Sequence, residues 1–159
     1  MSLEIERKFL LREEPEWLDE FPSVHIRQGY VAIVEGETEV RVRETDHGRV
    51  LTVKRGSGEV RREEEVELAP DQFRSLWPLT EGLRVAKRRY TVPSEDLTIE
   101  VDVFEGPLRG IVMAEVEFDS EEASKAFRPP DWLGDEVTGD GRYANESLAI
   151  RGAPEDRTE

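Results

Sequence analysis

Apolar and polar residues alternate along much of the chain, and a period of two residues indicates β-strands. The alternating segments lie at about 3–10, 25–34, 38–45, 49–55, 60–68, 84–92, 97–104 and 111–119. Short turn-like segments at 35–37, 46–48 and 56–58 separate consecutive strands, as they do between antiparallel neighbours. The pattern therefore predicts eight antiparallel strands.

Short helices are predicted after the fifth and the eighth strand. Pro70 and Asp71 suit the first turn of a helix, and the apolar residues at 73, 76 and 77 follow at helical spacing. Ser120, followed by two glutamates, predicts the N-cap of a helix that runs to Phe127. A last ordered piece is expected over 137–150, with a helical turn from Arg142.

The fold class that follows is α+β. Eight antiparallel strands can close into a barrel just wide enough for side chains or one small ligand, with a few flanking helices. At 159 residues, the chain has the size of one domain. We expect a single domain over residues 1–151 and a flexible C-terminal tail over 152–159.

One side of each predicted strand is charged and the other is mainly apolar, with a change of register expected near Val50 and Leu51. In a simple sandwich the charged sides would face water. Here, however, bases dominate the strands at 38–45, 49–55 and 84–92, whereas 97–104 and 111–119 carry only acids on this side. Such segregation predicts a charged interior with a basic and an acidic wall.

Composition narrows the partners. The chain has 22 basic and 37 acidic residues, a net charge of −15, which argues against nucleic acids and anionic membranes. Cysteine is absent and histidine occurs twice, so disulfides, thiolate sites and multi-histidine zinc sites are excluded. No apolar run approaches about 18 residues, and the first residues do not have the pattern of a signal peptide. We therefore expect a cytoplasmic protein.

Lysine is rare, which makes its positions informative. Of the 22 basic residues 4 are lysine, and three of these, Lys8, Lys54 and Lys87, lie on the charged sides of strands. Lysine and arginine donate charge-assisted hydrogen bonds to phosphate oxygens. The hard carboxylate oxygens of the acidic strands suit Mg²⁺ or Mn²⁺. Together, the two walls predict a metal-assisted site for a linear polyphosphate.

The segment Glu4-Ile5-Glu6-Arg7-Lys8 resembles the ExExK signature of the CYTH proteins, also called triphosphate tunnel metalloenzymes. The likeness continues over about residues 3–150, through Gln28-Gly29-Tyr30, Val40-Arg41-Val42-Arg43, Leu51-Thr52-Val53-Lys54, Arg61-Arg62-Glu63-Glu64-Glu65, Lys87-Arg88-Arg89-Tyr90, Glu100-Val101-Asp102, Ala114-Glu115-Val116-Glu117, Trp132-Leu133-Gly134, Val137-Thr138-Gly139-Asp140 and Arg142-Tyr143-Ala144-Asn145.

The resemblance implies an eight-stranded tunnel and a role for each charged set. By that likeness the metal ligands would be Glu4, Glu6, Glu115 and Glu117. The triphosphate would be bound by Lys8, Arg41, Arg43, Lys54, Arg61, Lys87 and Arg89. Binding a second metal or orienting the attacking water would fall to Glu63, Glu65, Glu100 and Asp102, which with Lys8 form the expected catalytic set.

The resemblance also implies an activity. The pattern looks most like the branch that hydrolyses inorganic tripolyphosphate, with Mg²⁺ or Mn²⁺ as cofactor and a small triphosphate as the only expected partner. Thiamine triphosphatase and adenylate cyclase activity remain alternatives. So does a polyphosphate or nucleotide sensor that binds without turnover, and the oligomeric state stays open between monomer and homodimer.

Overall fold

The computed structural model describes residues 5–56 and 62–154, which form two compact units. The first unit comprises residues up to Val24 together with Lys87–Gly141, and the second comprises His25–Ala86 together with the segment from Arg142. Strands β2 (Ser23–Val34) and β6 (Arg84–Ser94) run from one unit into the other. The part of the chain that the structure describes contains eight strands, and all pairings within the units are antiparallel, which confirms the predicted strand number and direction.

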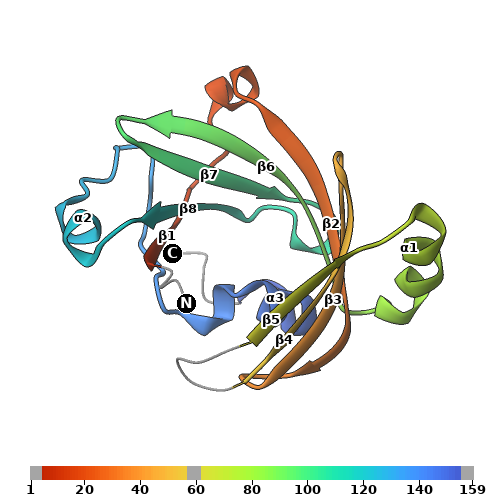
Figure 1. Ribbon diagram of the computed structural model, residues 1–159. Helices are drawn as coiled ribbons and strands as arrows, with labels where there is room; N and C mark the ends of the chain where they lie inside the picture. The colour runs from red at the N-terminus through yellow and green to blue at the C-terminus, as the bar shows by residue number, and fades with distance from the viewer. Residues whose placement is uncertain (1–4, 57–61, 155–159) are drawn as a thin grey trace. The chain divides into compact units, whose positions relative to one another are not determined.

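The first unit orders its strands β1-β8-β7-β6. Besides β6, these strands are β1 (Ile5–Leu10), β7 (Leu97–Phe104) and β8 (Val112–Phe118). Figure 1 shows the helix α2 (Glu121–Ala126) beside β1 and β8. The apolar core of this unit lies on the side of the sheet opposite the charged residues. It includes Phe9, Val101 and Val116, and Phe127 packs against it.

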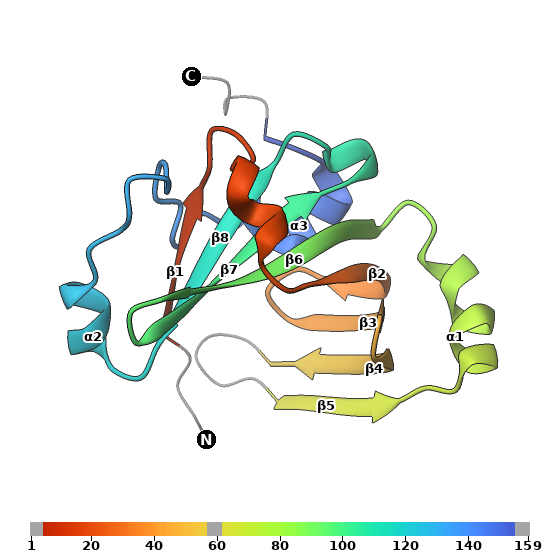
Figure 2. The same cartoon turned by 90° about the horizontal axis from the view of Figure 1, so that it is seen from above.

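The second unit orders its strands β2-β3-β4-β5, which lie side by side in Figure 2. The strands after β2 are β3 (Thr38–Thr45), β4 (Gly48–Arg55) and β5 (Arg62–Glu67). A bulge interrupts the pairing of β2 with β3 between Tyr30 and Ala32. The helix α1 (Pro70–Leu76) leads into a 3-10 turn, Trp77–Thr80, and the last helix α3 (Asn145–Arg151) is tied to the β2–β3 turn by Arg151 and Glu35.

Local sequence signals explain the helix boundaries. Pro70 occupies the first position of α1, and the Ser120 hydroxyl accepts a hydrogen bond from the Ala123 amide at 3.0 Å, so both predicted helix starts are confirmed. The helical turn expected at Arg142 is a 3-10 turn, Gly141–Tyr143, ahead of α3. None of the helices within residues 5–56 and 62–154 has the length and apolar character that a bilayer crossing requires.

The change of register expected near Val50 was wrong. The pairing of β4 with both neighbours is continuous, and Val50 lies opposite Arg43 and Glu67 on the charged side. Leu51 lies opposite Val42 and Val66 on the other side. The strict alternation of the strand therefore overrides the apolar character of a single residue.

Gly29 allows close packing between the sheet of the second unit and the turn after α1. A Cβ atom at this position would lie 2.4 Å from the Thr80 hydroxyl oxygen, and Thr80 is fully buried. The Thr80 hydroxyl donates to the Trp77 carbonyl at 2.7 Å and accepts from Arg84 Nε at 2.9 Å. The motif Gln28-Gly29-Tyr30 thus places two polar side chains on the charged side of β2 and leaves space for Thr80 on the opposite side.

Candidate functional site

In the first unit, the strand register gathers the predicted residues on one side of the sheet. Lys8 on β1 pairs with Glu115 on β8, which in turn pairs with Glu100 on β7. One row further along, Arg89 on β6 pairs with Asp102. Directly opposed residues share a face of an antiparallel sheet, so these side chains belong to one surface.

Lys87, Arg89 and Asp102 form a buried ion triad. Asp102 accepts hydrogen bonds from Arg89 Nε at 2.8 Å and Arg89 Nη2 at 2.9 Å, and Lys87 Nζ lies 2.9 Å from its Oδ2. Lys87 is fully buried, with its ammonium 5.4 Å from the centre of the Phe104 ring. Both carboxylate oxygens of Asp102 are therefore engaged by cations.

Charge pairing outweighs burial at this triad. Burial alone would raise the pKa of Asp102, but the charge of Lys87 and the hydrogen bonds from Arg89 lower it to about 2. Burial likewise disfavours the charge of Arg89, and the neighbouring Asp102 more than compensates, so the pKa of Arg89 is raised. Asp102 and Arg89 are therefore ionised at neutral pH, and with Lys87 counted as an ammonium the triad carries a formal net charge of +1.

The acids of β1, β7 and β8 oppose one another in like-charged pairs. Glu6 pairs with Glu117, and Glu100 pairs with Glu115. Directly opposed like charges destabilise a sheet, and a bound cation would remove that repulsion. Lys8 Nζ, 3.8 Å from Glu115 Oε1, offsets part of it.

The donor chemistry of these pairs fits a metal ion. Carboxylate oxygens are the ligands that Mg²⁺ and Mn²⁺ prefer. Within residues 5–56 and 62–154, however, no three acidic or histidine side chains converge closely enough to form a preassembled metal cluster. Glu4, the fourth predicted ligand, lies outside the described residues, as does Arg61 of the predicted substrate-binding set.

In the second unit, a basic surface covers β3 and β4. Arg41 Nη1 donates to Glu39 at 3.2 Å, and Arg43 Nε donates to Gln28 at 2.7 Å. Lys54 Nζ lies 3.8 Å from Glu63 on β5. The predicted cations of these strands therefore share one side of the sheet with two acidic neighbours.

Arg41 carries an unsatisfied donor. Among buried side-chain nitrogens and oxygens of the described residues, its Nε is the one atom without a hydrogen-bond partner. A buried unpaired donor is costly unless a ligand supplies an acceptor. The Arg41 Nε can therefore donate a hydrogen bond to a ligand or to water.

The acids of β5 lie on a strand that is exposed along its whole length. Glu65 lies opposite Thr52, whose hydroxyl donates to it at 3.4 Å, and Glu67 lies opposite Val50. A cavity of about 360 Å³ is lined by residues of β3, β4 and β5 that include Arg43 and Glu65. The structure thus places Arg43, predicted to bind phosphate, and Glu65, a predicted catalytic acid, at the same cavity of the second unit.

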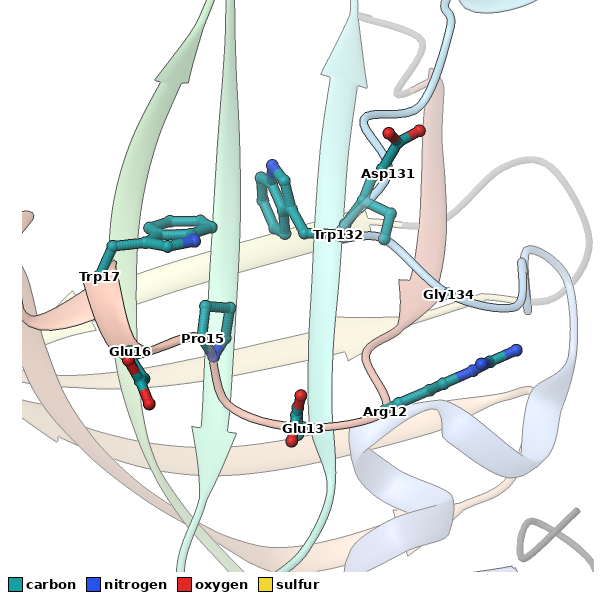
Figure 3. A pocket seen from close by; sticks show the side chains of 9 residues that line it. Arg12, Glu13, Pro15, Glu16, Trp17, Asp131, Trp132 and Gly134 are labelled. Carbon is teal, nitrogen blue, oxygen red and sulfur yellow. The ribbon is translucent and has the colours of Figure 1, made fainter.

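A second cavity, of about 580 Å³, lies in the first unit and contains none of the predicted site residues. Figure 3 shows Trp17 and Trp132 facing each other in it, while Arg12 extends away from them. The two indole rings meet edge to face with centroids 5.0 Å apart. This agrees with the packing role that aromatic residues of this kind usually have.

Sequence reasoning assigned no role to Gln28 and Arg7. Gln28 is fully buried on the charged side of β2, where it binds both Arg43 and Tyr30. Arg7 lies on the apolar side of β1, where it donates to both oxygens of Glu136 at 2.9 and 2.8 Å. Its guanidinium also lies 5.4 Å from the Phe9 ring centre, which explains a charged residue on an otherwise apolar side.

The fold and the charged surfaces together describe a small protein of antiparallel strands whose basic side chains suit an anionic ligand. Comparison with known families places it more narrowly, because the CYTH domain family matches residues 2–151. The chain belongs to the CYTH domain family. The predicted eight-stranded α+β fold class is thereby confirmed.

Similar proteins are named for one activity. The inorganic triphosphatase of Nitrosomonas europaea is 44% identical over 149 residues, covering 92% of this chain and 97% of that protein. The inorganic triphosphatase of Acetivibrio thermocellus is 39% identical over 150 residues, covering 93% and 94%. The crystal structure of the inorganic triphosphatase NE1496 superimposes with a TM-score of 0.79 at 41% identity, covering 97% of this chain and 99% of that one.

More distant structures share the fold. The structure described as a putative adenylyl cyclase from Hippeastrum with a dominant triphosphatase activity has a TM-score of 0.52 at 18% identity, over 77% of this chain and 83% of that one. At this identity the likeness concerns the fold alone. It does not favour cyclase chemistry for this chain.

Proposed function

We propose that this protein hydrolyses the terminal phosphoanhydride bond of a triphosphate, with inorganic tripolyphosphate as its substrate. The observation that carries the proposal is the presence of both a basic and an acidic surface in a chain 44% identical to an inorganic triphosphatase. Family members are generally metal-dependent. The like-charged acid pairs of the first unit support the same requirement here.

Each charged set has a role in this proposal. Phosphate oxygens would be bound by Lys8, Arg41, Arg43, Lys54, Arg61, Lys87 and Arg89. Arginine can bind two oxygens at once, and the unsatisfied Nε of Arg41 supplies a donor that needs such an acceptor. Those cations of the set that contact the transferred phosphoryl group would also stabilise its negative charge in the transition state.

The acidic set would hold Mg²⁺ or Mn²⁺ through Glu4, Glu6, Glu115 and Glu117. When bound, a divalent metal neutralises phosphate charge and lowers the pKa of water. Glu63, Glu65 and Glu100 would orient the attacking water or accept its proton. Asp102, predicted to share that task, is engaged by Lys87 and Arg89, which supports a role in holding these two cations in place.

The experiment that tests the function is phosphate release by the purified protein. With Mg²⁺ or Mn²⁺, tripolyphosphate should be hydrolysed faster than ATP or thiamine triphosphate, and chelation by EDTA should stop the reaction. Glu6→Ala is the matched negative control, since it removes one proposed metal ligand. No release above this control would refute the proposal, whereas tight binding without release would indicate a sensor and cyclic AMP formation a cyclase.

We further propose a single CYTH domain over residues 1–151 in the cytoplasm. The family match over 2–151 supports the extent of the domain. The net charge of −15 supports the absence of nucleic-acid and membrane partners. The proposed flexible tail, 152–159, lies mostly outside the described residues, which end at Pro154.

A further inference from the structure

Gln28 is a neutral side chain buried within a charged surface. It is fully buried on β2, directly opposite Arg43 in the register of β2 and β3. Its Oε1 accepts a hydrogen bond from Arg43 Nε at 2.7 Å, and its Nε2 donates to the Tyr30 hydroxyl at 2.9 Å. Both ends of the amide are therefore used.

The two partners fix the direction of this amide. Arginine has only donors, so the oxygen of Gln28 must face Arg43, and the amino group must then face Tyr30. Tyr30 is 1% exposed, and burial is the largest cause that raises its pKa to about 12, so its hydroxyl remains neutral and can accept from Gln28. The chain Tyr30–Gln28–Arg43 is thus a defined sequence of donors and acceptors.

The hydrogen bond has a consequence for the guanidinium of Arg43. It occupies Nε and so sets the plane and the direction of the planar group, in which the two Nη nitrogens form the fork that binds two oxygens of a phosphate. An aspartate or glutamate at position 28 would hold the guanidinium equally well but would cancel its charge. A neutral amide orients the cation without adding a negative charge of its own.

We propose that Gln28 is a positioning residue for substrate binding, which holds Arg43 in the orientation that binds phosphate and is itself held by Tyr30. This inference rests on the proposed function for its substrate. It assigns Gln28 no contact with the substrate. The bulge after Tyr30 lies beyond this pair of residues, so both keep their place on the charged side of β2.

The test uses Gln28→Met, which keeps the length of the side chain and removes its polar atoms. Losing a hydrogen bond to a charged group corresponds to a rise in KM for tripolyphosphate of about 10-fold or more, with kcat changed much less. In an Arg43→Gln background the same substitution should change KM by less than about 2-fold, because its effect runs through Arg43. Equal factors in both backgrounds would overturn the proposal.

Tyr30→Phe and Thr80→Val complete the design. Tyr30→Phe removes the hydroxyl that anchors the amide, but this hydroxyl also bonds to Arg41, so only the part of its KM effect that disappears in the Arg43→Gln background reports on Gln28. Measured in this way, it serves if Gln28→Met does not fold. Thr80→Val also breaks buried hydrogen bonds in the second unit, on the other side of β2, and should lower the melting temperature with KM unchanged. An unchanged KM for Tyr30→Phe and Gln28→Met, with lowered melting temperatures, would show a purely structural role and refute the proposal.

Failure of the proposed function can be told apart from failure of this inference. Wild-type phosphate release tests the function alone. If the wild type releases none, titration calorimetry with tripolyphosphate in EDTA still measures affinity. Gln28→Met should then weaken binding in the Arg43 background and not in the Arg43→Gln background, and any other result would overturn the inference.

Discussion

Replacing Asp102 by Asn should destabilise the protein strongly, because it removes the only negative charge of the buried triad. Lys87 is fully buried and Arg89 is largely buried, and both lie within 2.9 Å of the Asp102 carboxylate. Removing one partner of a buried ion pair costs about 3–5 kcal/mol, since the remaining charge is left uncompensated. Asparagine has nearly the same volume, so the loss would not reflect a cavity.

Urea denaturation followed by circular dichroism measures this effect. With a slope of about 2 kcal/mol per molar urea, a loss of about 3–5 kcal/mol lowers the midpoint by about 1.5–2.5 M. Glu35→Gln is the matched control, because Glu35 and Arg151 form an equally short pair at 2.7 Å with side chains 45% and 59% exposed. An exposed pair is screened by water, so this control should shift the midpoint little.

A second substitution separates charge from packing. In the Asp102→Asn background, Lys87→Met removes the uncompensated ammonium and should recover part of the lost stability. A midpoint for Asp102→Asn that equals that of the Glu35→Gln control would refute the reasoning. So would a further loss on adding Lys87→Met, because the triad would then contribute through packing alone.

Three further predictions follow from single contacts. Gly29→Ala should lower the free energy of unfolding by about 1–3 kcal/mol, because its Cβ would meet Thr80, whereas Gly141→Ala, with open space around it, should be nearly neutral in thermal unfolding. Glu136→Gln should lower stability by less than about 1 kcal/mol at pH 7, since that side chain is 38% exposed. The pKa of Glu136 is lowered to about 2, so urea midpoints of the two proteins should converge between about pH 4.5 and pH 2, and a constant gap would contradict the assignment. Glu117→Gln should raise the stability of the metal-free protein by about 0.2–1 kcal/mol and abolish most of the rise in melting temperature on adding Mg²⁺; an unchanged rise would exclude it as a ligand.

The fold was predictable because its strands have two chemically different sides. The alternation in β1, β3, β7 and β8 matches the observed register, so residues assigned to the charged side from the sequence share that side in the structure. Ser120 and Pro70 were readable as helix starts because their roles depend on local backbone groups. Val50 was misassigned since a single apolar residue on a charged side looks like a shift in the pattern.

The site was predictable only in part, for reasons that differ between residues. Arg43 and Asp102 are charged, so the pattern of charged residues along the strands identifies them. Their hydrogen-bond partners lie on neighbouring strands, and the pattern of a single strand does not reveal them. Gln28 is neutral, so no search for charged sides selects it, although its place two residues before Tyr30 on the same side was a signal. Arg7 was readable as an exception on an apolar side, while its partner Glu136 lies 129 residues away.

The cations of the charged sides are held by two kinds of partner, and the difference bears on anion binding. Asp102 fixes Lys87 and Arg89 by opposite charge, which leaves a net charge of +1 from two cations. Gln28 holds Arg43 through a neutral amide, which adds no negative charge. A polyanion is attracted by the positive charge that remains after the protein's own charges have paired. A carboxylate that holds a cation in place therefore weakens the attraction of that cation for a polyanion, whereas an amide that holds it does not. A fully buried cation such as Lys87 needs a carboxylate partner, because an unpaired charge there would be too costly, whereas a part-exposed guanidinium such as that of Arg43 can also be held by a neutral group.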